Sequence, residues 1–343
     1  MALSQKITKF VSQSLKTSNL QILPLAGDAS SRRYFRVVKD NESWVLMAWE
    51  PFEDRKSFPF LNIRDHFAKH DVQVPEVIDC DPGLGVVLLE DLGDLTLERK
   101  FWENQSQELA LPFYKQALDE LIKIHFKVSK DPSPNCSAFQ VRFDKAKLMW
   151  ELNYGREHVL EKLNQLHLSA KAQAELDSAF DDMCGQLDRE PKFICHRDFH
   201  SRNLMLTLGK MRVIDFQDAR MGPIQYDLVS LVFDAYVNLT DPSREALVND
   251  YLEKALPHLG KGFSRAHFEE IFAVQVIQRS FKAAGSFASF YNLRGDRRYI
   301  KYIQPTLKIV AAHAERLPEY SAFIDILASE GILDRGYEEL CAP

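Results

Sequence analysis

Residues 192–220 read KFICHRDFHSRNLMLTLGKMRVIDFQDAR, and this stretch decides the fold. Two short apolar runs within it, Phe193–Cys195 and Met211–Ile214, have the length and composition of β-strands. Each run ends abruptly in polar residues that include an aspartate, Asp198 after the first run and Asp215 after the second. The pattern predicts two strands whose following loops present both carboxylates at neighbouring positions.

Two carboxylates and an amide in such loops fit the transfer of a phosphoryl group from ATP, a reaction that depends on positioning and charge neutralisation. Asp198 is the predicted base, which orients the attacking hydroxyl and takes its proton. Asn203 and Asp215 are predicted to hold Mg²⁺, a hard cation that prefers oxygen ligands. The alternative is a polar loop between core strands with His196 as a structural histidine, and the order of several residue types argues against it.

Polar residues around this centre have predicted supporting roles. Gly209-Lys210 is predicted to form a hairpin turn. Asp218 is either a third metal-site carboxylate or an acceptor that fixes its loop. Asp227 is predicted at an N-cap or in a first helical turn, where its carboxylate would accept hydrogen bonds from free amides and support the metal loop. His200 either orients Asp198 or faces the acceptor.

The motif HRDFHSRN at 196–203 resembles the protein-kinase catalytic loop, and Asp215-Phe216 resembles the metal-binding Asp-Phe-Gly with Gln217 in place of glycine. With the second histidine and the run IDFQD at 214–218, the chain resembles the aminoglycoside phosphotransferase and choline kinase family, whose members phosphorylate small molecules. The resemblance implies a two-lobed, protein-kinase-like α+β fold. A small β-rich N-lobe would span residues 1–92 and a large, mostly helical C-lobe residues 93–343, with ATP and Mg²⁺ in the cleft between them.

The composition is that of a globular protein that acts on small molecules. The chain has 343 residues and a net charge of −6, which argues against a nucleic-acid partner. Its five cysteines are widely spread and include no Cys-x-x-Cys pair, so neither a disulfide framework nor a zinc site is indicated. No stretch has the pattern of a signal peptide or a membrane span. We expect a cytoplasmic monomer.

The first part of the chain has the order of a kinase-like small lobe. Residues 20–25, 33–38 and 43–49 have strand patterns. In the resemblance, the loop 26–31 folds over the nucleotide phosphates, with backbone amides and hydroxyls as donors from Gly27, Ser30 and Ser31. Taken alone, this loop would be a surface hairpin turn. In the family, backbone groups from Glu90 to Leu92 form the hinge that binds the adenine edge, and a plain turn is the alternative.

The third strand departs from the kinase pattern. It reads WVLMAW at 44–49 and has no lysine, whereas kinases place one there to hold the α and β phosphates. Strand alternation puts Arg32 and Arg36 on one face and Arg33 on the other, so the three cannot all replace it. Arg33 or a neighbour is predicted to do so. For each arginine, a solvated edge position is the alternative.

Acceptor-binding residues are predicted on the catalytic loop and on the helix predicted at 143–163. Small-molecule kinases build their acceptor site in the region that here contains Glu151, Asn153 and Tyr154, and these could bond a sugar. His200 and Arg202 are the further candidates. A helix face with exposed polar groups is the alternative for the first three.

Three further segments narrow the resemblance, namely GDASSRRY at 27–34, QRSFKAAGSFA at 278–288 and RGD at 294–296. They are similar to those of the bacterial anomeric amino-sugar kinases, which phosphorylate the C1 hydroxyl of N-acetylmuramate and N-acetylglucosamine in cell-wall recycling. The anomeric hydroxyl is more acidic than an ordinary alcohol, so an unperturbed carboxylate would be an adequate base. A kinase for choline, an aminoglycoside or another sugar remains an alternative, and a strongly anionic pocket would favour it. The second alternative is a non-catalytic nucleotide-binding protein.

Overall fold

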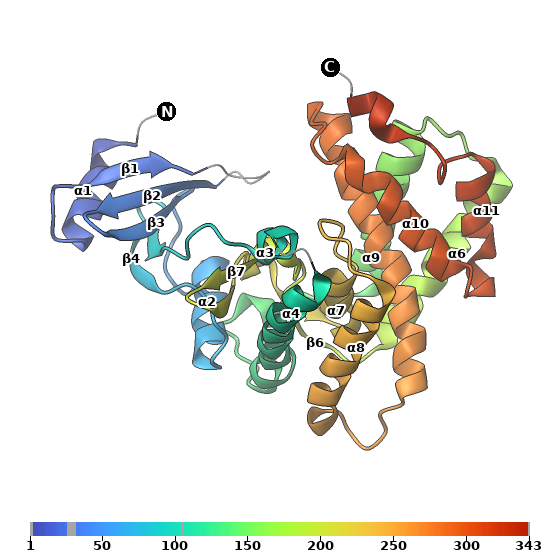
Figure 1. Ribbon diagram of the computed structural model, residues 1–343, viewed down its shortest axis with the longest axis horizontal. Coiled ribbons are helices and arrows are strands. Elements are labelled where there is room, and N and C mark those ends of the chain that lie inside the picture. Colours follow the sequence, from blue (N-terminus) through green and yellow to red (C-terminus); the bar gives the residue numbers. More distant parts are fainter. Residues whose placement is uncertain (1–2, 26–31, 104–105, 342–343) are drawn as a thin grey trace.

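The computed structural model describes residues 3–25, 32–103 and 106–341, which form a small sheet-containing part and a larger helical part (Figure 1). The small part has a five-stranded antiparallel sheet in the order β1-β2-β3-β5-β4. Its strands are β1 (Gln21–Pro24), β2 (Arg33–Lys39), β3 (Glu42–Ala48), β4 (Val77–Asp81) and β5 (Val86–Glu90), and its helices are α1 (Gln5–Ser14) and α2 (Pro59–Lys69).

The alternating pattern of β2 separates the two faces of this sheet. Phe35 and Val37 are buried in a cluster with Val11 of α1. Tyr34 and Arg36 point to the opposite face, which lines a cavity. Because side chains of a strand alternate, a one-residue change of register would exchange the two sets.

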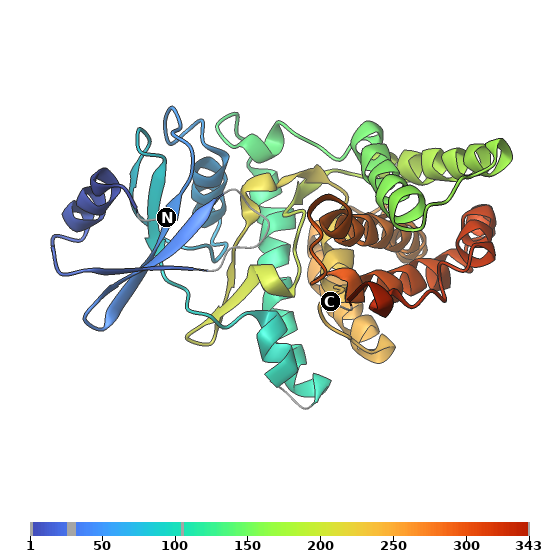
Figure 2. The same ribbon diagram turned by 90° about the horizontal axis from the view of Figure 1, so that it is seen from above.

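The larger part is mostly helical, as the sequence predicted. Its helices are α3 (Leu97–Glu103), α4 (Gln107–Ile122), α5 (Lys145–Gly155), α6 (Ala170–Arg189), α7 (Ile224–Val232), α8 (Asp241–Ala255), α9 (Arg265–Arg294), α10 (Ile303–Ala314) and α11 (Ser321–Ser329). The sheet and helices α9 to α11 lie at opposite ends of the molecule, with α4 between them (Figure 2). In the parts of the chain that the structure describes, no helix combines the length and apolar character needed to cross a membrane.

Two antiparallel strand pairs carry the segment from which the sequence analysis began. β6 (Phe193–Cys195) pairs with β9 (Arg220–Gly222), and β7 (Leu204–Thr207) pairs with β8 (Lys210–Val213). The β7–β8 turn is Leu208-Gly209, one residue earlier than predicted. Both residues have positive φ angles, 51° and 77°, and this combination suits the twist of a two-residue hairpin.

The long helix α9 crosses α5 at a point where both helices have glycine. A Cβ atom on Gly285 would lie 2.6 Å from the Cα atom of Gly155. Any larger side chain would therefore push the two helix backbones apart. The two glycines therefore allow α9 to pack closely against α5.

Phe216, which follows Asp215, anchors the small part to the helical part. Its ring lies 5.2 Å from that of Phe60 and 5.9 Å from that of Phe67, both on α2. The amide of Val213 also donates to the carbonyl of Gln73 at 2.7 Å. These contacts fix the Asp215 loop against the small part. The lobe boundary between residues 92 and 93 stays a prediction.

Candidate active site

The catalytic loop, residues 196–203, joins β6 to β7 and is held in place by Asp227. This carboxylate is fully buried in the first turn of α7 and accepts from the backbone amides of His196 at 2.6 Å and Arg197 at 2.9 Å. Arg197 has a φ angle of 85°, which a non-glycine residue rarely adopts. The free amides that Asp227 was predicted to serve are thus those of the catalytic loop, not those of its own helix.

His196 joins the catalytic loop to the Asp215 loop. Its buried ring lies with Nε2 2.9 Å from the carbonyl oxygen of Ile214. The amide of Ile214 in turn donates to the carbonyl of Asn203 at 3.0 Å. His196 therefore has a structural role, since it helps to hold the two loops together.

Asn203 and Asp215 lie together, as predicted for a metal site. The Asn203 Nδ2 atom donates to the carbonyl of Asp198 at 2.9 Å and lies 3.4 Å from Asp215 Oδ2. Burial, followed by the nearby charge of Asp198, raises the pKa of Asp215, although a hydrogen bond from Gln217 opposes this. A cation bound beside this carboxylate would favour its ionised form. Oxygen donors beside an undercompensated carboxylate fit Mg²⁺.

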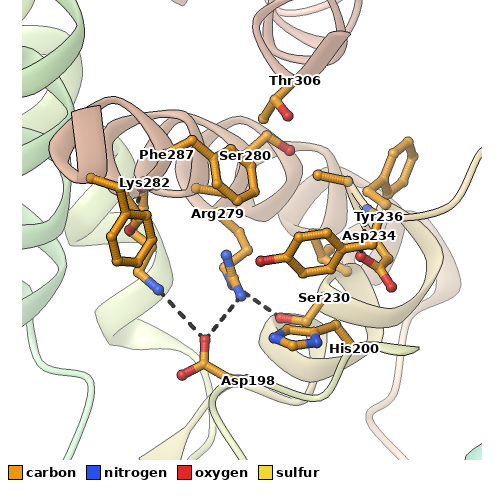
Figure 3. Close-up of a pocket in the computed structure, with 16 residues that line it drawn as sticks. Asp198, His200, Ser230, Asp234, Tyr236, Arg279, Ser280, Lys282, Phe287 and Thr306 are labelled. Atoms are coloured by element: carbon orange, nitrogen blue, oxygen red, sulfur yellow. Dashed lines mark hydrogen bonds and ion pairs between the residues drawn. The ribbon is translucent and has the colours of Figure 1, made fainter. Parts of the chain in front are cut away.

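Asp198 is surrounded by cations. Its Oδ1 atom lies 3.2 Å from Arg279 Nη2 and 3.6 Å from Lys282 Nζ, both on α9 (Figure 3). Arg197 Nε lies 3.8 Å from the other carboxylate oxygen. Burial alone would raise the pKa of Asp198, but the charges of Lys282, Arg197 and Arg279 together hold it well below its ordinary value. Asp198 is therefore ionised at any working pH.

Asp198 also separates two cavities. The cleft cavity, of about 820 Å³, lies between the two parts of the molecule, and its walls include Tyr34, Leu89, Glu90, Leu92, Asn203 and Asp215. The inner cavity lies against α9, and its walls include Tyr236, Arg279, Lys282, Phe287 and Thr306. Asp198 and His200 line both. A group held at Asp198 could thus be reached from either side.

Glu90 and Leu92 line the cleft cavity, where the hinge was predicted. The side chain of Glu90 pairs with Arg212, and the carbonyl of Leu92 accepts from Thr207 Oγ1 at 2.7 Å. These contacts order the connection between the sheet and the helical part. The predicted phosphate-binding residues Gly27, Ser30 and Ser31 lie outside the described residues.

The three arginines proposed in place of the strand lysine have different surroundings. Arg33 is exposed and does not line the cleft cavity, because its side chain is on the sheet face opposite Arg36. Arg36 forms two ion pairs, from Nε to Asp91 Oδ2 at 2.6 Å and from Nη2 to Asp94 Oδ1 at 2.9 Å. Arg32 packs over the ring of Trp49, and its charge lowers the pKa of Asp215. Arg33 is therefore not placed to replace the lysine, and of the other two Arg36 lines the cleft cavity, whereas Arg32 acts on Asp215 through its charge.

His200 and Arg202 both line the cleft cavity, on the catalytic-loop side. Burial lowers the pKa of His200 to about 3, so its ring is neutral, and its Nε2 lies 3.4 Å from Asn203 Nδ2. Arg202 makes two hydrogen bonds to Glu98, at 2.8 and 3.0 Å, and stacks over Tyr236. Both side chains are thus held at the wall of the site.

The prediction of acceptor contacts from Glu151, Asn153 and Tyr154 is not supported by their positions, since none of them lines either cavity. Glu151 is fully buried and accepts from Tyr226 and Gln278 at 3.2 and 3.0 Å. The ring of Tyr154 stacks on Trp150 and contacts His158. The polar side of α5 packs within the helical part instead of facing the site.

Asp218 pairs with Arg197 Nη1 at 3.3 Å and is about half exposed. It fixes the loop instead of adding a third carboxylate to the metal site. Arg279 and Lys282 lie in the segment 278–288 that carries part of the family resemblance, but no role was predicted for either residue. The spacing of three between them was a usable signal, because it places both on one face of a helix.

The fold and the site define the class of the protein as a phosphotransferase with kinase-like architecture. A family model described as "Phosphotransferase enzyme family" matches residues 21–263. The N-acetylmuramate/N-acetylglucosamine kinase of Neisseria meningitidis serogroup B is 31% identical over 89% of this chain and 90% of its own. The kinase of the same name from Pseudomonas aeruginosa is 31% identical over 90% and 88%.

The crystal structure of a choline/ethanolamine kinase family protein from Mesorhizobium loti matches with a TM-score of 0.61 and 18% identity, covering 93% of this chain and 97% of that one. This likeness confirms the predicted α+β fold. The chain therefore belongs to the phosphotransferase enzyme family, in the group that includes the two bacterial relatives above. It is an ATP-dependent kinase by class.

Proposed function

We propose that the protein transfers the γ-phosphoryl group of ATP to the anomeric C1 hydroxyl of N-acetylmuramate, N-acetylglucosamine or both. The names of relatives that match about 90% of the chain support this proposal. The observation that carries it is the position of Asp198 between the Asn203–Asp215 pair and the inner cavity. A sugar at the mouth of the inner cavity would present a hydroxyl to Asp198 on the side away from the nucleotide.

The electrostatics of Asp198 suit an acidic hydroxyl. Since its pKa is held well below the ordinary value, its carboxylate is a weak base. A weak base serves best where the attacking hydroxyl gives up its proton readily or where proton transfer follows phosphoryl transfer. The anomeric hydroxyl has this property more than an ordinary alcohol. Asp198 then acts mainly by accepting a hydrogen bond that orients the nucleophile.

The cations of the inner cavity argue against the alternative acceptors. Arg279 and Lys282 face the place where the acceptor would bind, and both are within ion-pair distance of Asp198. The cavity also includes Asp234, but its carboxylate is buried and bonded to Ser201 and the amide of Tyr236. These residues therefore do not form the strongly anionic pocket that would bind choline or an aminoglycoside.

On the nucleotide side, Asn203 and Asp215 would hold Mg²⁺, which would neutralise the charge of the phosphates. We further propose that Arg32 supplies the positive charge that β3 lacks. Its charge lowers the pKa of Asp215, one of the two proposed Mg²⁺ ligands. The adenine would bind near Glu90–Leu92. Since ATP is the donor, we expect the reaction in the cytoplasm.

The test is phosphorus NMR of the products formed from ATP, Mg²⁺ and each sugar. A sugar 1-phosphate signal that couples to the anomeric proton is expected. Asp198→Asn should abolish it, whereas Asp218→Asn, a matched change at a half-exposed neighbour, should retain it. If the wild type forms no sugar phosphate, or phosphorylates a different hydroxyl, the proposal is wrong. ATP binding without release of ADP in the presence of any sugar would favour the non-catalytic nucleotide-binding role.

A further inference from the structure

Arg279 and Lys282 belong to the inner cavity alone. Neither lines the cleft cavity, in which Asn203 and Asp215 lie. They are three residues apart on α9, and both side chains point to Asp198 (Figure 3). Their charges are therefore on the acceptor side of Asp198, where they meet the sugar and not the nucleotide phosphates.

The two cations share one carboxylate. Among the described residues, Asp198 is the acid within ion-pair distance of either Arg279 or Lys282. Arg279 is the more firmly engaged, because it lies closer to Asp198 and its Nε atom also donates to Ser230 Oγ at 3.0 Å. The Lys282 ammonium is 3.6 Å away, and its side chain is only 12% exposed. Lys282 is the cation that lacks a full counter-charge.

Other charged groups near Lys282 do not supply that counter-charge. Glu151 lies behind α9 and is bonded to Tyr226 and Gln278. Burial, together with the charge of Arg279, lowers the pKa of Lys282 to about 8, against the opposing effects of Asp198 and Glu151. A second anion in the inner cavity would stabilise the charged ammonium.

The inner cavity has a volume of about 110 Å³, and its remaining walls suit a substituent of a sugar that is bound at its mouth. Tyr236, Phe287 and Phe290 provide aromatic surface, and Ser286 and Thr306 provide hydroxyl groups. A mainly apolar pocket with a few fixed polar groups binds a small molecule in one orientation. A sugar that carries an acidic substituent would match both the aromatic surface and the ammonium.

We propose that Lys282 binds a carboxylate of the acceptor and so makes the enzyme selective for acidic amino sugars. N-acetylmuramate carries such a group, the lactyl ether at C3, where N-acetylglucosamine has a hydroxyl. The inference rests on the proposed function, since it assigns the acceptor specificity of the same site. Arg279 acts as a positioning residue that keeps Asp198 in place while Lys282 turns to the substrate.

The test compares kcat/KM for the two sugars in the wild type, Lys282→Met and Lys282→Arg. Methionine has a similar length without the charge, and arginine keeps the charge. We expect Lys282→Met to reduce the N-acetylmuramate to N-acetylglucosamine ratio by about 10- to 100-fold, the usual range for a lost charge-assisted contact. Lys282→Arg should retain most of the ratio. Equal losses with both sugars would overturn the inference, since they would mean that the charge acts on Asp198 or on the transferred phosphoryl group.

A second measurement does not depend on a folded variant. In the wild type, the methyl ester of N-acetylmuramate, which lacks the charge, should have a kcat/KM about 10- to 100-fold lower than the free acid. An ester that performs as well as the acid would overturn the inference while leaving the proposed function intact. If the wild type phosphorylates neither the acid nor N-acetylglucosamine, the proposed function fails and the inference fails with it.

Discussion

Replacing Asp227 with asparagine should damage the catalytic loop without touching a substrate. The carboxylate accepts from the amides of His196 and Arg197, and it is fully buried. An asparagine can accept one of these bonds, but its NH₂ group would then face the other donor. A lost charge-assisted bond and an unpaired buried amide cost about 1–3 kcal/mol each, so we expect a loss of about 3 kcal/mol in the free energy of unfolding.

The same change should reduce turnover. Arg197 holds a φ angle of 85°, which costs about 1–3 kcal/mol and persists because its amide is bound. Without that bond the loop can relax and displace Asp198. A displacement of about 1 Å can lower the rate by about 100-fold. We therefore expect kcat to fall by about 100-fold, with little change in the KM for ATP.

Thermal unfolding and steady-state kinetics test this reasoning together. A loss of about 3 kcal/mol corresponds to a decrease in Tm of roughly 4 °C in a protein of this size. Asp218→Asn is the matched control, because Asp218 pairs with the same Arg197 but is half exposed, and such pairs contribute about 0–1 kcal/mol. If Asp227→Asn has a wild-type Tm and kcat, Asp227 does not hold the loop in the way described.

Three further predictions follow from single positions. Gly285→Ala should lower the Tm by several degrees, because the added methyl group would collide with Gly155 at a cost of about 1–3 kcal/mol. Gly185→Ala is the control and should not lower it, because a Cβ atom there would lie 3.6 Å from its nearest neighbour. Asp215→Asn should raise the Mg²⁺ concentration needed for half-maximal turnover by more than tenfold, and an unchanged Mg²⁺ curve would exclude Asp215 as a ligand. The pKa of Lys282, about 8, means that the ammonium is charged below that pH and neutral above it, so kcat/KM for N-acetylmuramate should fall as the pH rises past about 8. The same decline with N-acetylglucosamine would contradict the role of Lys282.

The catalytic centre could be predicted because its determinants are local. Asp198, Asn203 and Asp215 lie within one strand–loop–hairpin segment, and the strand pairs of that segment bring them close together. The same holds for β2, whose alternation correctly separated Arg33 from Arg36. Neither conclusion needed knowledge of distant packing.

The acceptor side could not be predicted in this way. Arg279 lies on α9, whose packing includes the close approach of Gly285 to Gly155, and the sequence pattern does not indicate which distant glycines will meet. The polar residue Glu151 was expected in the site for its chemistry, yet it is buried under α9 and bonded there. A helix pattern shows which residues share a face but not what that face meets.

The surroundings of the two aspartates shift their pKa values in opposite directions, and this difference supports different roles for them. Three cations keep Asp198 charged without any ligand, so it is ready to orient a hydroxyl when the sugar arrives. Burial, and then the charge of Asp198, raise the pKa of Asp215, and a cation bound beside it would lower that pKa. Pairs of acids whose surroundings separate their pKa values commonly divide the work of a site. The difference in pKa is consistent with the proposed roles of Asp215 as a metal ligand and of Asp198 as the group that orients the acceptor hydroxyl.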